Sequence, residues 1–135
     1  MVDLMTYEGE NLSGQPWDVY PRPQMRRECW RNLNGQWEFT AVGGAVVPPA
    51  AYDLTIRVPF CPESDLSGIG YKDFIPAVWY RRKINISEDR KKGRIFLHFG
   101  AVDYKATVYI NGVLVGSHVG GYSSFCFEIG LPVLV

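Results

Sequence analysis

The 135-residue sequence predicts an all-β fold, built as an antiparallel β-sandwich. Three observations support this prediction. Several short segments alternate apolar and polar residues, which is the period-two pattern of strands with one buried face. Turn-forming residues separate these segments. No long segment carries apolar residues at the 3.6-residue spacing of a helix with recognisable caps.

The stretch from Arg94 to Ile129 shows the strand pattern most clearly. Alternate residues in its apolar runs are expected on the buried faces of strands. These residues are Ile95, Leu97, Phe99, Ala106, Val108, Ile110, Phe125, Phe127 and Ile129. The dipeptide Asn111-Gly112 lies between two of the runs. It predicts a two-residue hairpin, because a type I′ turn needs positive φ at both central positions.

Three earlier strands are predicted at Gln36–Ala41, Leu54–Val58 and Ala77–Ile86. Pro59 ends the second strand, because proline lacks the amide hydrogen that a sheet needs. The long loop Phe60–Ile75 follows, and loops of this length are usually functional or interfacial. In the third strand, alternation places Trp79 and Arg81 on the face opposite Tyr80.

The domain organisation is predicted to be simple. Residues 1–27 hold three prolines and few alternating positions, so we expect an extended lead-in. Trp17 and Tyr20 are the expected anchors of this segment through the packing of their rings. Residues 28–135 are predicted to form one sandwich domain, and the chain is long enough for a single hydrophobic core.

The composition is that of a globular chain, with 47% hydrophobic and 14% aromatic residues. Its 14 Lys and Arg balance its 14 Asp and Glu, which argues against binding to nucleic acid or to an anionic membrane. No run approaches the roughly 18 apolar residues of a membrane span. The sequence begins MVDLMTYEGE, with acidic residues where a signal peptide has basic ones, and we expect a cytoplasmic protein.

The cysteines Cys29, Cys61 and Cys126 are widely spaced and form no Cys-x-x-Cys motif. This spacing favours neither a disulfide framework nor a zinc site. We therefore expect ordinary buried or half-buried thiols, and neither a metal ion nor another cofactor.

The acidic residues do not predict a catalytic pair. Glu63 and Asp65 lie two apart in one loop, a spacing that enforces no geometry, and the other acids lie in loops or at turns. The serines lack the Gly-x-Ser-x-Gly frame of a nucleophile elbow. His98 is expected on the solvent side of its strand, because it alternates out of phase with Leu97 and Phe99.

Two other features are candidates for ligand binding. Trp79 shares its face with Arg81 and could offer a platform for a sugar ring. Packing against a neighbouring domain or sheet is the alternative role for this ring. His118 precedes the bend Gly120–Tyr122, whose glycines allow a tight turn or a close backbone approach. A single histidine does not make a metal site.

Several motifs, taken in order, resemble one known family. They are Asn34–Phe39, Val58–Phe60, Pro62–Ser64, Ser67–Ile69, Val78–Arg82, Phe99–Asp103, Val108–Gly112, and Val115–His118 with Gly120–Tyr122. Together they resemble the N-terminal sugar-binding domain of glycoside hydrolase family 2, which includes β-galactosidases and β-glucuronidases. The resemblance extends from about Pro21 to Ile129.

The resemblance implies a jelly-roll sandwich similar to galactose-binding domains. In the family, this domain precedes an immunoglobulin-like domain and a TIM barrel that carries both catalytic glutamates. This chain is then an accessory domain without catalytic residues, and the parent protein hydrolyses a β-glycoside by a retaining mechanism. An autonomous carbohydrate-binding module is the alternative. The candidates for contact with carbohydrate or with the missing domains are Asp73, Trp79, Arg81, His118, Gly120, Gly121 and Tyr122.

The sequence departs from the family pattern after Ile129, where it ends with an apolar tail, residues 130–135. The resemblance implies that the last strand of the sandwich is truncated. An exposed sheet edge is prone to pairing with another copy. We expect Leu131–Val135 to pair with the sheet or with a second molecule.

Overall fold

The computed structural model describes residues 4–17, 19–20, 22–41 and 47–130. It consists mostly of strands in small antiparallel sheets, with little helix, which confirms the all-β, antiparallel class. The chain divides into two compact units, Met1–Lys83 and Ile84–Val135. The predicted boundary between a lead-in and a domain at residue 27 stays a prediction, and the tail Leu131–Val135 lies outside the described residues.

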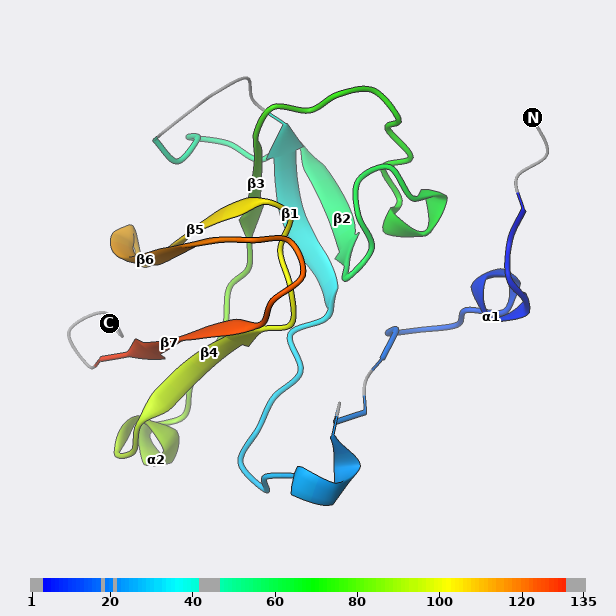
Figure 1. Ribbon diagram of the computed structural model, residues 1–135. Coiled ribbons are helices and arrows are strands. Elements are labelled where there is room, and N and C mark those ends of the chain that lie inside the picture. Colours follow the sequence, from blue (N-terminus) through cyan, green and yellow to red (C-terminus); the bar gives the residue numbers. More distant parts are fainter. Residues whose placement is uncertain (1–3, 18, 21, 42–46, 131–135) are drawn as a thin grey trace. The chain divides into compact units, whose positions relative to one another are not determined.

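The first unit is organised around one three-stranded sheet. Its strands are β1 (Gly35–Ala41), β2 (Leu54–Val58) and β3 (Val78–Arg81). Strand β1 lies in the middle and pairs antiparallel with both neighbours (Figure 1). The register places Trp37 opposite Ile56 and Phe39 opposite both Leu54 and Tyr80.

One face of this sheet carries the buried apolar residues. Phe39 is 1% exposed and Ile56 is fully buried. The Tyr80 ring meets Phe39 edge-on, with ring centroids 5.2 Å apart. Burying side chains of this size stabilises a fold by about 1.5–3 kcal/mol each. The apolar face therefore holds the strands in their register, because a one-residue slip would turn these side chains to the other face.

The opposite face of the sheet is polar. Alternation and register bring Gln36, Glu38, Thr55, Arg57, Trp79 and Arg81 to this side. Thr40 also lies on this face and is buried. The predicted separation of Trp79 and Arg81 from Tyr80 is confirmed by the pairing of β3 with β1.

Short helical turns and side-chain contacts order the rest of the first unit. These turns are α1 (Tyr7–Glu10) and the 3₁₀ turns Pro23–Met25 and Asp65–Ser67. The Tyr20 ring packs edge-on against Trp30, with centroids 4.9 Å apart, as predicted for an anchor. Trp17 is exposed, but its carbonyl accepts a hydrogen bond of 2.6 Å from the Asn32 side chain. The start of the chain is thus tied to the segment that leads into β1.

The second unit contains two two-stranded antiparallel sheets. Strands β4 (Ile95–Phe99) and β7 (Phe125–Ile129) form one sheet, and β5 (Lys105–Ile110) and β6 (Val113–Val119) form the other. The predicted alternation is confirmed in β4 and β7. Every second residue is less exposed than the residues between them, namely Ile95, Leu97, Phe99, Phe125, Phe127 and Ile129. Asn111 and Gly112 have φ of 50° and 80°, as the predicted type I′ hairpin requires.

Two predictions about local structure are wrong, for the third strand and for the cysteines. The third strand covers only Val78–Arg81, because the next side chain, Arg82, donates to the carbonyl groups of Leu33 and Asn34 at 2.6 and 2.9 Å. The charged segment after Ser87 forms one turn of helix, α2 (Glu88–Lys91). All three cysteines are exposed free thiols.

The alternation of side chains along β7 explains why Cys126 is exposed. Cys126 lies between Phe125 and Phe127, so it occupies the outer face of β7. The register places it opposite His98, which is exposed as predicted. Neither of the α-helices in the described residues is long and apolar enough to cross a bilayer.

Candidate functional site

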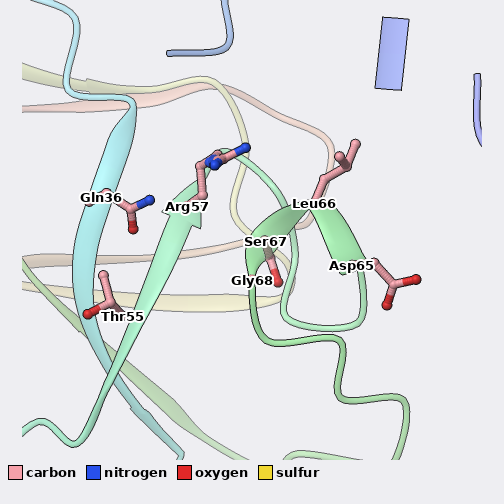
Figure 2. A pocket seen from close by; sticks show the side chains of 7 residues that line it. All are labelled: Gln36, Thr55, Arg57, Asp65, Leu66, Ser67 and Gly68. Atoms are coloured by element: carbon pink, nitrogen blue, oxygen red, sulfur yellow. The ribbon is translucent and has the colours of Figure 1, made fainter. Parts of the chain in front are cut away.

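A polar hollow of about 250 Å³ lies on the polar face of the first unit. Figure 2 shows that β1 and β2 supply one side of it and that the turn after Pro62 supplies the other. Its lining residues are Gln36, Thr55, Arg57, Asp65, Leu66, Ser67 and Gly68. The hollow thus combines an amide, two hydroxyl groups, a guanidinium and a carboxylate within one compact unit.

The turn beside the hollow is held by its own hydrogen bonds. The Ser64 hydroxyl oxygen accepts from the Leu66 amide at 3.3 Å, and the Ser67 oxygen accepts from the Ile69 amide at 3.0 Å. Gly68 has φ of 84°, a left-handed conformation that glycine adopts without strain. Ser67 is 1% exposed. The predicted long loop is therefore locally ordered where it meets the sheet.

Arg57 is the distinctive charged group of the hollow. Its side chain is half-buried and forms no hydrogen bond or ion pair with another residue in the part of the chain that the structure describes. Gln36 lies directly opposite it on β1. Asp65 is exposed, and its carboxylate points away from the strands in Figure 2. The guanidinium is thus available to an anionic ligand.

The predicted platform of Trp79 and Arg81 lies on the same polar face, but its cation is already paired. Arg81 donates two hydrogen bonds to the Glu38 carboxylate, at 2.6 and 3.0 Å. Its guanidinium also lies 4.2 Å from the centroid of the Tyr52 ring. The hydrogen bond from Arg81, together with its positive charge, lowers the pKa of Glu38. Trp79 itself is half-buried.

The second unit contains the predicted bend around His118. The His118 ring stacks on Phe125, with centroids 4.2 Å apart and an interplanar angle of 12°. Its Nε2 lies 3.3 Å from the Ser123 hydroxyl. Its Nδ1 is buried and has no hydrogen-bond partner among the described residues. His118 is thus part of an aromatic stack rather than an exposed base.

The two glycines of the bend allow both a turn and a close approach. Gly120 has φ of 132°, and its amide donates to the Tyr104 carbonyl at 2.8 Å. A Cβ at Gly121 would lie 2.7 Å from Oδ1 of Asp103, which is closer than real Cβ atoms come. Tyr122 is fully exposed. The predicted role of glycine in this bend is confirmed as a backbone requirement.

The predicted site residues lie in three separate regions of the chain. Asp73 is exposed in the loop before β3, and Trp79 and Arg81 share one face of β3. His118 lies near the end of β6, and Gly120, Gly121 and Tyr122 lie in the bend that follows it. Their contact with carbohydrate or with other domains stays a prediction. Among the described residues, no group of three or more His, Cys, Asp or Glu is arranged to hold a metal ion.

Sequence reasoning missed most of the polar hollow. From the sequence, Gln36, Thr55 and Arg57 are placed in strands, and Gln36 and Ser67 also belong to motifs of the family resemblance, but none of these residues is a predicted ligand contact. The signal that the sequence offered was alternation: polar residues occupy positions 36 and 38 of one strand and positions 55 and 57 of the next. Only the pairing of the two strands shows that these polar residues lie on the same face of the sheet.

Comparisons with known proteins show that the chain is similar to glycosidases. No family model matches it. It is 37% identical over 114 residues to a β-glucuronidase of Streptococcus agalactiae, covering 84% of this chain and 18% of the relative. It is 40% identical over 58 residues to a β-galactosidase of Thermoanaerobacter pseudethanolicus, covering 43% of this chain and 8% of the relative.

A solved structure supports the same relationship. The Bifidobacterium dentium β-glucuronidase complexed with coumarin-3-O-glucuronide matches with a TM-score of 0.56 and 29% identity, covering 71% of this chain and 17% of that one. The chain spans between 7% and 20% of the length of the curated relatives it matches. Over most of its length, the chain is thus homologous to part of the β-glucuronidases and β-galactosidases of glycoside hydrolase family 2.

Proposed function

We propose that this chain is the accessory N-terminal, sugar-binding-type domain of a family 2 glycosidase, with the jelly-roll sandwich of that domain. The observation that carries the proposal is the asymmetry of coverage: one alignment takes in 84% of this chain but only 18% of a β-glucuronidase. The antiparallel sheets of both units agree with a sandwich architecture. Its role is to support the catalytic barrel of the whole protein.

A β-glucuronide is the substrate we propose for the whole protein. The β-glucuronidases that match this chain align over 112 to 132 residues. Two β-galactosidases align over 58 and 50 residues, despite their 40% identity. The longer alignments favour a parent of the β-glucuronidase kind, with an immunoglobulin-like domain and a barrel as the partners of this one.

The carboxylates of the described residues support an accessory rather than a catalytic role. Enzyme-scale acceleration requires at least about 8 kcal/mol of barrier lowering, and a retaining glycosidase obtains it from two carboxyl groups about 5–5.5 Å apart. Glu38 and Glu128 are each held by an arginine, at 2.6 and 2.7 Å. Glu63 and Asp65 are exposed in one loop.

A chimeric enzyme tests this proposal. The segment of the Streptococcus agalactiae β-glucuronidase that aligns with this chain is replaced by the aligned residues of this chain. We expect a soluble chimera that hydrolyses p-nitrophenyl β-D-glucuronide within about tenfold of its parent, since the domain contributes support and not chemistry. The purified 135-residue chain alone is expected to release no nitrophenol.

The matched control is the same β-glucuronidase with the segment deleted. It should lose solubility or turnover, because the barrel then lacks its support. A chimera that fails in the same way as the deletion variant would refute the proposed domain role. Turnover by the isolated chain that scales with its concentration would refute the absence of catalytic residues.

A free carbohydrate-binding module is the second candidate, favoured by the position of Trp79 on the polar face. It is the weaker proposal, because Arg81 already pairs with Glu38. A sugar-dependent change in tryptophan fluorescence that is lost in Trp79→Ala and kept in Trp17→Ala would favour it. Trp17 is a suitable control because it is exposed and lies in the lead-in.

A further inference from the structure

Two arginines of the described residues are half-buried, and only one of the two has partners there. Arg82 donates to the carbonyl oxygens of Leu33 and Asn34, at 2.6 and 2.9 Å. Arg57 forms no hydrogen bond or ion pair with another described residue. A half-buried guanidinium has lost part of its hydration, and hydrogen bonds are the usual compensation for that loss. Arg57 therefore lacks this compensation in the part of the chain that the structure describes.

Two more exposed arginines show which partner a guanidinium beside these strands takes. Arg81 donates two hydrogen bonds to the Glu38 carboxylate, at 2.6 and 3.0 Å. Arg94 donates two to the Glu128 carboxylate, at 2.8 and 2.7 Å. These arginine side chains are 45% and 72% exposed, yet each has a carboxylate partner. Arg57 has the greater need of one, because its side chain has less contact with water.

The lining of the polar hollow favours a carboxylate over an anion of higher charge. Among the described residues that line it, Arg57 is the one cation. Gln36 lies directly opposite Arg57, and Thr55 lies on the same face of β2, so an amide and a hydroxyl group offer neutral donors beside it. A carboxylate accepts two parallel hydrogen bonds from a guanidinium and balances its charge. A phosphate dianion would keep one negative charge without a cation.

The size of the hollow favours the tip of a side chain over a free ligand. Its volume of about 250 Å³ lies below the range of about 300–1,000 Å³ that is typical of sites for drug-sized ligands. The carboxylate and the neighbouring methylene groups of an aspartate or glutamate side chain need less room than such a ligand. The rest of the polypeptide that carries this side chain stays outside the hollow.

The proposed function supplies a source for this side chain. The chain spans between 7% and 20% of the length of the curated relatives it matches, so the proposed accessory domain adjoins a much larger remainder. Interfaces between domains are fairly polar, and arginine is enriched at the residues that contribute most to binding. The nearby acids do not serve Arg57, because Glu38 is paired with Arg81 and the Asp65 carboxylate points away from the strands in Figure 2.

The other candidates in the described residues carry less. The apolar hollow beside Leu54, Tyr71 and Phe74 is larger, at about 450 Å³, but nothing in the structure identifies what covers it. The polar face near Trp79 has its cation neutralised by a carboxylate. The His118 stack is filled by aromatic rings.

We infer that the hollow at Arg57 is a docking point for an aspartate or glutamate side chain from the part of a family 2 glycosidase that lies outside this chain. The Arg57 guanidinium holds the carboxylate through two parallel hydrogen bonds, and Gln36 and Thr55 donate to the same group. No covalent step is involved. The inference rests on the proposed function, because that function requires the larger protein. It adds the chemistry of one contact, which homology does not specify.

A titration of the ¹⁵N-labelled 135-residue chain with N-acetyl-glutamic acid amide, a capped glutamate, tests the chemistry of the hollow. N-acetyl-glutamine amide is the matched probe, because it has the same shape without the charge. At the efficiency of drug-sized ligands, a probe of about 13 non-hydrogen atoms has a dissociation constant on the order of 1 mM. We expect saturable amide shifts at residues 36 and 55–57 with capped glutamate, and at least about tenfold weaker binding of capped glutamine. Arg57→Met should abolish this difference, and Arg90→Met, on the exposed α2, should keep it.

The chimeric β-glucuronidase tests whether a side chain of the larger protein fills the hollow. Arg57→Met keeps the aliphatic stem but leaves the docking carboxylate without its partner. It should shorten the half-time of thermal inactivation, measured on p-nitrophenyl β-D-glucuronide, at least about tenfold. Arg90→Met removes one positive charge from an exposed position and should leave this half-time unchanged.

Gln36→Glu gives a signature that a merely structural role of Arg57 would not give. It places an internal carboxylate directly opposite Arg57. In the isolated chain it should raise the urea midpoint, because opposite charges directly across a strand pair attract. In the chimera it should shorten the half-time of inactivation, because the internal carboxylate displaces the docking one. Gln24→Glu, at an exposed position of the lead-in, should do neither, and this pair decides if Arg57→Met does not fold.

Four results would overturn the inference. They are equal binding of the two probes, binding of D-glucuronate more than about tenfold tighter than that of capped glutamate, equal half-times for the Arg57→Met and Arg90→Met chimeras, and a Gln36→Glu effect of the same sign in both proteins. An active chimera that is indifferent to Arg57→Met refutes this inference alone. A chimera that is inactive whichever residue occupies position 57 refutes the proposed function, and the inference falls with it.

Discussion

Gly116 allows an aromatic ring to lie directly on the backbone of β6. A Cβ added at this position would come within 2.4 Å of Cε1 of Phe127 and 2.9 Å of its Cδ1. Non-bonded carbon atoms prefer about 3.5–4.0 Å. The ring would therefore have to retreat by roughly 1 Å, and it packs edge-on against Phe125, which is itself stacked on Phe99 and His118.

The expected effect of Gly116→Ala follows from these contacts. Overpacking of this kind costs about 1–3 kcal/mol. Alanine also lowers the conformational entropy of the unfolded chain, which stabilises the folded state by about 0.4–1 kcal/mol. The net loss in the free energy of unfolding is about 1–2 kcal/mol. Gly100→Ala is the matched control, because no atom lies within 4 Å of its Cβ and it should gain up to about 1 kcal/mol.

Urea denaturation, followed by tryptophan fluorescence and circular dichroism, measures this difference. With a slope of about 2 kcal/mol/M for a chain of this size, the midpoints of the two variants should differ by about 1 M. In a Phe127→Leu background the penalty of Gly116→Ala should shrink, because the smaller side chain leaves room. Equal midpoints for the two alanine variants, or a penalty that Phe127→Leu does not change, would refute the reasoning.

Two further predictions concern the first unit. Phe39→Ala should lower the free energy of unfolding by about 3–5 kcal/mol in the same urea assay, because it empties a fully buried site. Its control, Phe74→Ala, lies at a residue that is 87% exposed and should change the free energy of unfolding by less than about 0.5 kcal/mol. Similar losses in both variants would contradict the assigned core. Although Tyr80 is 37% exposed, desolvation raises the pKa of its hydroxyl from 10.0 to about 12, with smaller contributions from the charges of Cys61 and Glu63. Because the folded state then keeps a proton that the unfolded state loses, this contribution to stability is complete below pH 10 and is lost as the pH rises through about 12. Tyr80→Phe should flatten the loss of stability in that window and remove a phenol that titrates near pH 12 from the absorbance titration at 295 nm. A titration curve that the substitution leaves unchanged above pH 11 would count against the raised pKa.

The strands of the second unit were predictable because local chemistry determines them. Asn111 and Gly112 form the turn through their own φ preferences, and β4 and β7 each carry an apolar residue at every second position. The same reasoning overestimated β3, because the role of Arg82 depends on carbonyl groups 48 and 49 residues earlier in the chain. A long-range contact of this kind leaves no periodic signal in the sequence.

The polar hollow was not predictable for a related reason. Its residues come from β1, β2 and the turn Asp65–Ser67, which are brought together only by strand pairing and by the hydrogen bonds of the turn. Each residue alone has an ordinary explanation as a solvent-facing strand residue or a turn residue. The absence of a partner for Arg57 among the described residues is likewise visible only once its neighbours are in place.

The direction of the pKa shifts bears on where the proposed glycosidase chemistry lies. A general acid that works near neutral pH needs a carboxyl pKa raised by burial or by a neighbouring negative charge. Glu38 and Glu128 are shifted the opposite way, because hydrogen bonds from Arg81 and Arg94 stabilise their charged forms. Such carboxylates stay ionised and serve as cross-strand ties, between β1 and β3 and from the start of β4 to β7. The pKa values of these two carboxyl groups therefore shift in the direction that suits a structural ion pair, which is opposite to the shift that a general acid needs.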